Sequence, residues 1–238
     1  MKNIVTIFRK QLKETMRNKE VLIQFLMFPV LAVFMTKSIQ IEGMPPNFFV
    51  QLFSTMYVGM APLVSMEAIL SEEKEKNTLR VLLMADVTPW QYLAGVGGYV
   101  FLFCMLGAGA FCLLGGYGSG EAVLFLAVLG AGILVSMLLG AAIGAGSSSQ
   151  MAANSVGVPL MLLLSFLPML SLFNAHISKV TGLVYTEQIR RMLTALGEGE
   201  AIGEGLLVIG GSFLLFGGFF VWQYHGSLAR DKYLSHNG

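Results

Sequence analysis

The sequence predicts an all-α membrane protein with six transmembrane helices, and two observations lead to this fold class. Of its 238 residues, 55% are hydrophobic and only 12% are charged, whereas about 25% are charged in a typical soluble domain. The apolar residues gather in six runs, each about long enough, at roughly 1.5 Å per helical residue, to cross roughly 30 Å of hydrocarbon. One soluble core could not bury this much apolar surface, so a bilayer is the expected surrounding.

Residues 1–20 predict an interfacial amphipathic helix ahead of the first span. Ile4, Phe8 and Leu12 fall on one arc of a helix, and lysines and arginines occupy the adjacent arc. A basic amphipathic helix of this kind lies on an anionic membrane leaflet. The segment lacks the small-residue cleavage site of a secretory signal peptide, so we expect no cleavage there.

The first two spans are expected at about residues 21–39 and 48–70. Pro29 and Pro62 fall inside them, and proline in a span is tolerated where neighbouring helices satisfy the freed backbone groups. Both helices are therefore expected to be kinked and buried. Glu67, the single acidic residue within an apolar run, lies toward the inner end of the second span. It either reaches the interface or caps a helix end, or it acts in ion coupling.

Residues 71–89 form the longest polar island between two full-length spans. Five charged residues open it: Glu72, Glu73, Lys74, Glu75 and Lys76. Glu72 and Lys76 stand four residues apart in the order that stabilises a helix, and leucines follow at helical spacing from Leu79. The pattern predicts a short amphipathic helix outside the bilayer, with solvated carboxylates.

The third and fourth spans are expected at about residues 90–114 and 122–145, joined by a glycine-rich turn. Small residues recur every four positions on one face of the fourth span: Gly132, Ser136, Gly140 and Gly144. Such a ladder lets another backbone approach closely, so this face is expected to pack against a neighbouring helix. An uncharged loop that contains Ser148 and Gln150 leads to the fifth span, at about 155–173.

Residues 174–204 form a polar segment that is too long for a plain connection. Its apolar residues share one helix face: Ile189, Met192, Leu193 and Leu196. We expect an amphipathic helix that lies at the outer membrane boundary or dips into it. The sixth span follows at about residues 205–224.

Six spans place both termini on the same side of the membrane. With the termini in the cytoplasm, eleven of the fifteen Lys and Arg residues are cytoplasmic: six in residues 1–20, three in 71–91 and two after 224. This distribution satisfies the positive-inside rule. The sequence therefore predicts a multi-pass protein of the cell membrane with cytoplasmic termini, and it places residues 174–204 outside.

The charged island and the residues after it resemble the first cytoplasmic loop of type-2 ATP-binding-cassette exporter permeases. The matching residues are the run of Glu and Lys, then Asn77-Thr78-Leu79, two further leucines, and Trp90-Gln91-Tyr92-Leu93-Ala94-Gly95. The family usually has Gly where Asn77 stands, and Lys where Val96 follows Gly95. The motif covers residues 72–95, and the six-span plan covers nearly the whole chain.

The resemblance implies the six-span subunit of an exporter driven by a separate cytoplasmic ATPase, with ATP and magnesium bound to that partner. The N-terminal helix would also pack against this ATPase. The coupling residues would be Glu72, Glu73, Lys74, Glu75, Lys76, Thr78, Leu79, Ser148 and Gln150. Of these, Ser148 and Gln150 would form a second and smaller contact.

A second copy of the chain, or a related permease, would complete the substrate pathway in such an exporter. The residues expected to line it are Phe53, Met56, Tyr57, Met60, Phe166 and Met169. These soft apolar side chains suit a hydrophobic or amphipathic cargo such as a peptide, drug or lipid-like molecule. Methionine and phenylalanine in a span also serve as plain packing, and both interpretations stay open.

The sequence lacks the motifs of several other classes of protein. No G-x-x-x-x-G-K-[ST] motif is present, so any ATP dependence is expected to come from the partner. The three histidines form no H-E-x-x-H pair, and we expect neither a metal site nor catalysis. Membrane lipids and protein partners are expected, whereas nucleic acid is not.

The alternative function is a stand-alone carrier or channel driven by an ion gradient. Such a protein needs ionisable groups at mid-membrane, where Glu67 is the only candidate in the spans. A structural or assembly factor is a third possibility, but it would not need so ordered a polar island.

Overall fold

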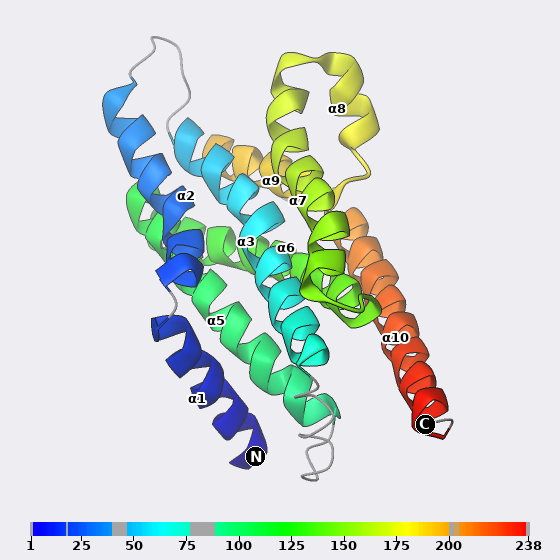
Figure 1. The fold of residues 1–238 in the computed structure, drawn as a ribbon. Helices are drawn as coiled ribbons and strands as arrows, with labels where there is room; N and C mark the ends of the chain where they lie inside the picture. Colours follow the sequence, from blue (N-terminus) through cyan, green and yellow to red (C-terminus); the bar gives the residue numbers. More distant parts are fainter. Residues whose placement is uncertain are drawn as a thin grey trace.

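A computed structural model of the chain describes residues 2–17, 19–39, 47–76, 89–199, 203 and 205–236. Within these ranges the protein is entirely helical, which confirms the predicted all-α class. The helices are α1 (Lys2–Arg17), α2 (Lys19–Ser38), α3 (Phe48–Glu75), α5 (Pro89–Gly115), α6 (Ser119–Gly146), α7 (Gln150–Phe173), α8 (Ala175–Thr181), α9 (Tyr185–Glu198) and α10 (Leu206–His236). Figure 1 shows them as one bundle, with α1 at one end and α8 at the other.

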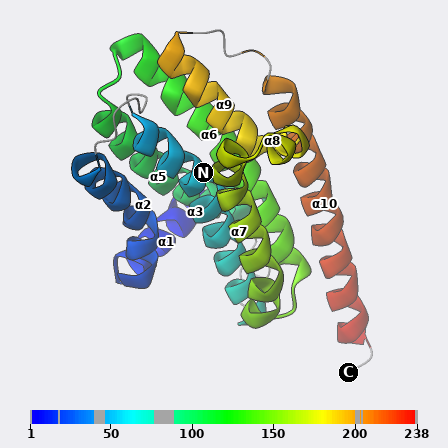
Figure 2. The same cartoon turned by 90° about the horizontal axis from the view of Figure 1, so that it is seen from above.

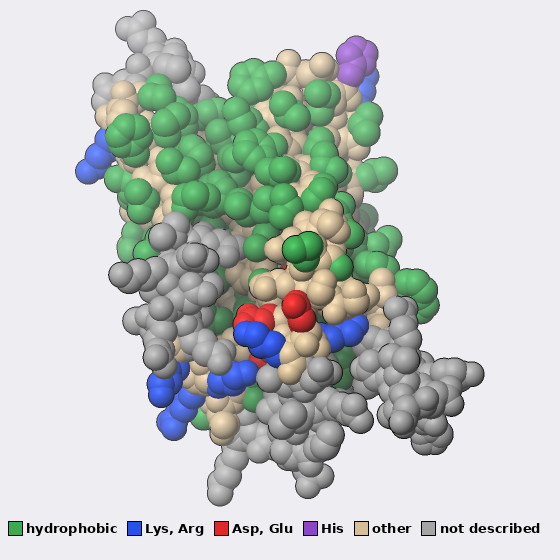
Figure 3. Space-filling view, viewed as in Figure 1, with side chains coloured by type: hydrophobic (Ala, Val, Ile, Leu, Met, Phe, Trp, Pro, Cys, Tyr) green, Lys and Arg blue, Asp and Glu red, His purple; other side chains and the backbone are tan. Residues whose placement is uncertain are grey.

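Five of the described helices, α3, α5, α6, α7 and α10, are long and apolar enough to cross a membrane. Within α2, the described segment Phe25–Ser38 is apolar but shorter than these five helices. These helices indicate a multi-pass membrane protein. In the space-filling view, apolar side chains cover a broad band, and most of the charged side chains gather below it (Figure 3).

Three helices extend well beyond the expected spans, and one of them, α10, continues to His236 where residue 224 was the expected end. α3 continues to Glu75, so the first part of the polar island belongs to the same helix as the second span. α7 begins at Gln150, because the Ser149 side chain accepts a hydrogen bond from the Ala152 N–H at 3.2 Å and caps the helix there. The connection between α6 and α7 therefore shortens to residues 147–149.

Helix α3 is the centre of the bundle. It packs against α2, α5, α6, α7 and α9, and Figure 2 shows it surrounded by these helices. In the most apolar stretch of α3, 72% of the residues are buried inside the protein, whereas in the corresponding stretch of α10 only 11% are. This explains why α3 is the least hydropathic of the five candidate spans, since its polar side chains face protein rather than lipid.

The small residues of α6 lie directly against α3. A Cβ added at Gly140 would overlap the backbone of Leu63, and one added at Gly144 would meet the backbone carbonyl oxygen of Glu67 at 2.8 Å. The two helices therefore touch backbone to backbone. The carbonyl of Val58 accepts a hydrogen bond from the buried Ser136 hydroxyl at 2.6 Å, which adds a polar contact to the same interface.

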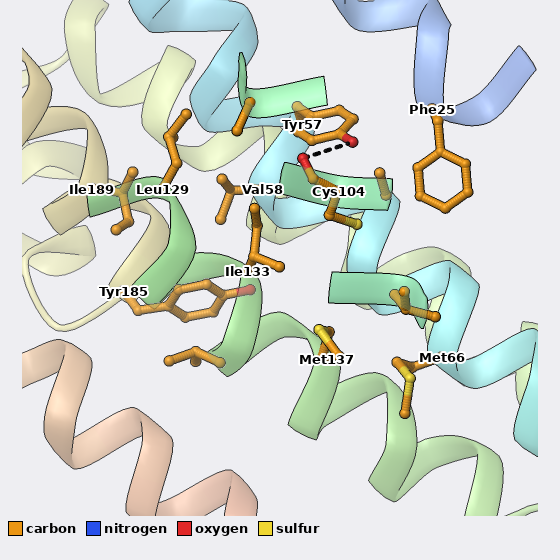
Figure 4. Packing of buried hydrophobic residues seen from close by; sticks show 14 of the residues in the cluster. Phe25, Tyr57, Val58, Met66, Cys104, Leu129, Ile133, Met137, Tyr185 and Ile189 are labelled. Atoms are coloured by element: carbon orange, nitrogen blue, oxygen red, sulfur yellow. Dashed lines mark hydrogen bonds between the residues drawn. The ribbon is translucent and has the colours of Figure 1, made fainter. Parts of the chain in front are cut away.

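Helix α9 packs against both α3 and α6. Tyr185 and Ile189 of α9 point toward Leu129 and Ile133 of α6 in Figure 4, and the Tyr185 hydroxyl lies 2.7 Å from the Ser136 hydroxyl. The expected amphipathic helix is thus present. Its apolar face packs on the protein core.

Replacing Gly140 with Ala should weaken the contact between α3 and α6. The new Cβ would collide with the Leu63 backbone, and overpacking of this kind costs about 1–3 kcal/mol. Gly109→Ala on α5 is the matched control, because a Cβ there has nothing within 4 Å. We expect only Gly140→Ala to lower the melting temperature of the detergent-solubilised protein. Equal melting temperatures for the two variants would contradict the close backbone contact.

Candidate functional site

The last turn of α3, Ser71–Lys76, is the starting point of the candidate site. Glutamate and lysine favour helix, so the polar turn continues the apolar helix without a break. The helix ends at Lys76, whose N–H donates to the Glu72 carbonyl at 2.9 Å. On the outer face, the Lys76 ammonium pairs with the Glu72 carboxylate, and the two side chains are 64% and 45% exposed.

Glu73 faces inward and ties α1 to α3. Its Oε1 accepts hydrogen bonds from Lys10 Nζ and Gln11 Nε2 of α1, both at 3.0 Å. The hydroxyl of Tyr92, on α5, lies close to the same carboxylate. Only 6% of Glu73 is exposed. The expectation of a solvated carboxylate was therefore wrong for Glu73, because α1 folds back across the end of α3.

Lys74 and Glu75 bind the two helix ends that meet in the connection between α6 and α7. Lys74 Nζ donates to the Ala145 carbonyl near the end of α6 at 2.7 Å. Glu75 Oε2 accepts from the Gln150 N–H at the start of α7, also at 2.7 Å. A cation at a helix C-terminus and an anion at a helix N-terminus both complement the helix dipole. These two consecutive residues therefore join α3 to α6 and α7.

Two groups of predicted coupling residues come together in this arrangement. Ser148 is exposed in the short connection, whereas the backbone of Gln150 is engaged by Glu75. Arg9 and Lys13 of α1 are also exposed. We call five side chains at this end the charged surface: Arg9, Lys13, Lys76 and Ser148, which are exposed, and Glu72, which is 45% exposed. Glu75 is exposed as well, but its carboxylate is engaged by the Gln150 N–H. Charged side chains gather at the same end in Figure 3. Thr78 and Leu79 lie outside the described residues.

The predicted pathway residues face different neighbours within one chain. Tyr57 is fully buried, and its hydroxyl donates to the Cys104 carbonyl of α5 at 3.3 Å (Figure 4). Met56 is also buried, and Phe53, Met60 and Met169 are half-buried against the core. Phe166 of α7 is 42% exposed. Of the six, Phe166 alone is largely accessible from outside the single chain, so a shared pathway stays a prediction.

Glu67 does not reach the interface or Lys74. It is 1% exposed, and its carboxylate presses against Gly157 of α7, where a Cβ would overlap the carboxylate oxygens. Its Oε1 is buried and has no hydrogen-bond partner. The expectation that Glu67 snorkels or caps a helix end is therefore not met, because α7 covers it.

A buried ionic cluster on α9 was missed at the level of sequence. Glu187 is fully buried and accepts hydrogen bonds from Arg190 Nη2 at 2.7 Å, Arg191 Nε at 2.9 Å and the Ser171 hydroxyl at 2.7 Å. Burial opposes ionisation of this carboxyl, but these hydrogen bonds outweigh it and lower the pKa of Glu187. The signal was the spacing of Glu187 from the two arginines, three and four residues on. Because Arg191 also donates to the Ser178 carbonyl, the cluster fixes α8 and α9 to α7.

No group of three or more His, Cys, Asp and Glu residues that could hold a metal ion occurs in the described part of the chain. Neither a protein-family model nor a curated protein matches this chain. The feature with the most specific geometry is the end of α3, where three consecutive residues bind α1, α6 and α7 and two flanking residues face outward.

Glu73→Gln should destabilise the protein more than Glu72→Gln. The Glu73 variant loses the charge that holds Lys10 and one strong hydrogen-bond acceptor, and hydrogen bonds to charged groups contribute about 1.5–3 kcal/mol. The Glu72 variant breaks one exposed pair, which costs at most about 1 kcal/mol. Melting temperatures in detergent measure the difference. An equal, small decrease in both would show that Glu73 is solvated.

Proposed function

We propose that this chain is the membrane subunit of a type-2 ATP-binding-cassette exporter, energised by a separate cytoplasmic ATPase. The observation that supports it best is the end of α3, where an exposed charged turn is joined to α1, α6 and α7. A soluble ATPase can move spans only through a part that it can contact and that does not bend independently. The last turn of α3 has both properties.

Force on this turn would pass to the rest of the bundle by a short route. α3 is one helix from Phe48 to Glu75, so a displacement of its exposed end shifts the buried span. Lys74 and Glu75 connect that end to α6 and α7, and Glu73 connects it to α1. The ATPase would contact Glu72, Lys76 and Ser148, whereas Glu73, Lys74 and Glu75 would transmit the movement inside the permease.

The finer features of the proposal follow from the resemblance and from the distribution of charge. α2 would be the sixth span, the charged surface would be cytoplasmic, and α8 and α9 would lie toward the outside. Two permease chains would enclose the pathway for a hydrophobic or amphipathic cargo. In the single chain, α7 has exposed apolar side chains, including Phe166. This face would contact lipid or the second permease chain.

One observation favours the alternative, an ion-gradient-driven carrier. Glu67 is a carboxylate buried within a candidate span, the kind of group that such carriers use. A carrier would not need a charged surface for an ATPase. Measurement of transport in proteoliposomes that contain only this chain distinguishes the two, because uptake driven by an imposed ion gradient alone would favour the carrier.

Charge reversal at the exposed pair should uncouple the permease without unfolding it. In the double variant Glu72→Lys with Lys76→Glu, the pair is re-formed in reverse, so the melting temperature should change little. A partner surface complementary to the original charges would meet like charges, at a cost of several kcal/mol. We expect loss of copurification with the partner ATPase, and loss of transport-stimulated ATP hydrolysis.

Lys179→Glu on α8 is the matched control, since Lys179 is equally exposed but lies at the other end of the bundle. It should leave copurification and ATP hydrolysis unchanged. Normal coupling in the Glu72 and Lys76 variant would exclude this turn as the docking site.

The proposed orientation predicts a simple labelling pattern. Ser148→Cys and Lys179→Cys both place a thiol at exposed positions, at opposite ends of the bundle. A membrane-impermeant thiol reagent added to intact cells should modify the Lys179 variant only, and lysis should expose the Ser148 variant. The reverse pattern would place the charged surface outside and remove the basis for ATPase docking.

A further inference from the structure

Glu67 occupies a closed site between three helices. Its backbone is in contact with α6, where Gly144 leaves no room for a side chain, and its carboxylate is directed at Gly157 of α7. On α7, Ala153 and Met161 lie one turn to either side of Gly157 and are buried. Both belong to a small apolar cluster with Leu63 of α3. The carboxylate is thus enclosed by backbone and hydrocarbon.

Among the residues whose side chains the structure describes, no cation neutralises this carboxylate. α7 contains no charged residue, and α6 contains only Glu121, near its far end. The Lys74 ammonium, about two turns further along α3, donates to the Ala145 carbonyl.

The described cations of α9, together with Lys10 of α1 and Lys37 of α2, are engaged or distant. Arg190 and Arg191 of α9 bind Glu187, and Lys10 of α1 binds Glu73. Lys37 of α2 is exposed near the opposite end of the bundle. An ionised, unpaired carboxylate in such a place costs far more than a neutral carboxylic acid, so the packed arrangement favours the acid.

We propose that Glu67 is a proton-binding site, which holds a proton while α3 and α7 are packed together and releases it when they separate and water enters. A proton fits the site better than a metal cation does. Calcium or sodium would need several oxygen ligands, whereas α7 presents a glycine and apolar side chains here. The site goes beyond the proposed transport function and does not depend on the source of energy.

The sign of the pH effect follows from proton counting. The packed arrangement holds one proton more than the opened arrangement, so raising the pH favours opening. Once the opened state has lost its proton, each pH unit changes the ratio of opened to packed protein by up to about tenfold. The side chain at position 67 remains neutral at every pH in the Glu67→Gln variant. The pH dependence that Glu67 gives to the ratio of opened to packed protein therefore disappears.

Infrared spectroscopy of the whole chain in lipid nanodiscs tests the proton directly. The difference between the parent and Glu67→Gln should contain the carbonyl band of a protonated carboxylic acid at neutral pH, and the band should vanish at higher pH. Glu72→Gln is the control, because Glu72 is exposed and paired with Lys76 and should give no acid band. A carboxylate band from Glu67 throughout this pH range would overturn the proposal.

Cysteine labelling tests the coupling between the proton and the contact of α3 with α7. Ala153→Cys introduces a thiol on the buried face of α7. Met151→Cys serves as the accessible control, because Met151 is 83% exposed in the parent protein. Cys104 and Cys112 are replaced by Ala in all variants. A water-soluble thiol reagent should reach the cysteine at position 153 increasingly as pH rises, and Glu67→Gln should remove the part of that rise that exceeds the Met151 control.

The two experiments separate the parts of the proposal. Equal labelling at position 153 with and without Glu67→Gln would overturn the coupling of proton release to opening. The infrared result needs no added cysteine, so it decides the proton-binding site even if Ala153→Cys fails to fold. Failure of ATPase docking would leave both results unaffected.

Discussion

The close contact between α3 and α6 is the constraint on which the rest of the structure depends. Helices in a bilayer gain no hydrophobic drive toward each other, so they associate where small residues allow dense packing. At Gly140 and Gly144 the missing side chains let the α6 backbone lie on that of α3. This contact makes α3 the central helix, and it brings the polar end of α3 to the connection between α6 and α7.

The division of labour at that end follows from helix geometry. Each residue turns the helix by about 100°, so consecutive side chains point in successive directions. Glu73, Lys74 and Glu75 thereby meet three different neighbours, α1, α6 and α7. Glu72 and Lys76, four residues apart, share the remaining face and pair with each other there. One turn of helix therefore carries both the internal connections and the external charges.

The five long apolar helices could be predicted from the sequence because lipid imposes a long apolar run wherever a helix is exposed to it. Whether each charged residue is buried or exposed could not be predicted, because it depends on segments far away in the chain. Glu73 is buried only because α1, some sixty residues earlier, folds across it. Glu67 is buried only because Gly157, ninety residues later, leaves room for its carboxylate. The ion pairs of Glu187 could be predicted from its spacing to the two arginines. Its burial could not, because it depends on the contact between α7 and α9.

The proton site and the charged surface lie on the same continuous helix, and this has a thermodynamic consequence. If docking of a partner at Glu72 and Lys76 favours an arrangement in which α3 leaves α7, it must also favour release of the proton from Glu67. Linkage is reciprocal, so loss of that proton must strengthen partner binding by the same factor. The two proposals are independent as observations, because one rests on exposed charges and the other on a buried acid. They become coupled only through the rigidity of α3. This segment is one continuous helix, and its buried residues extend from Val50 to Glu73.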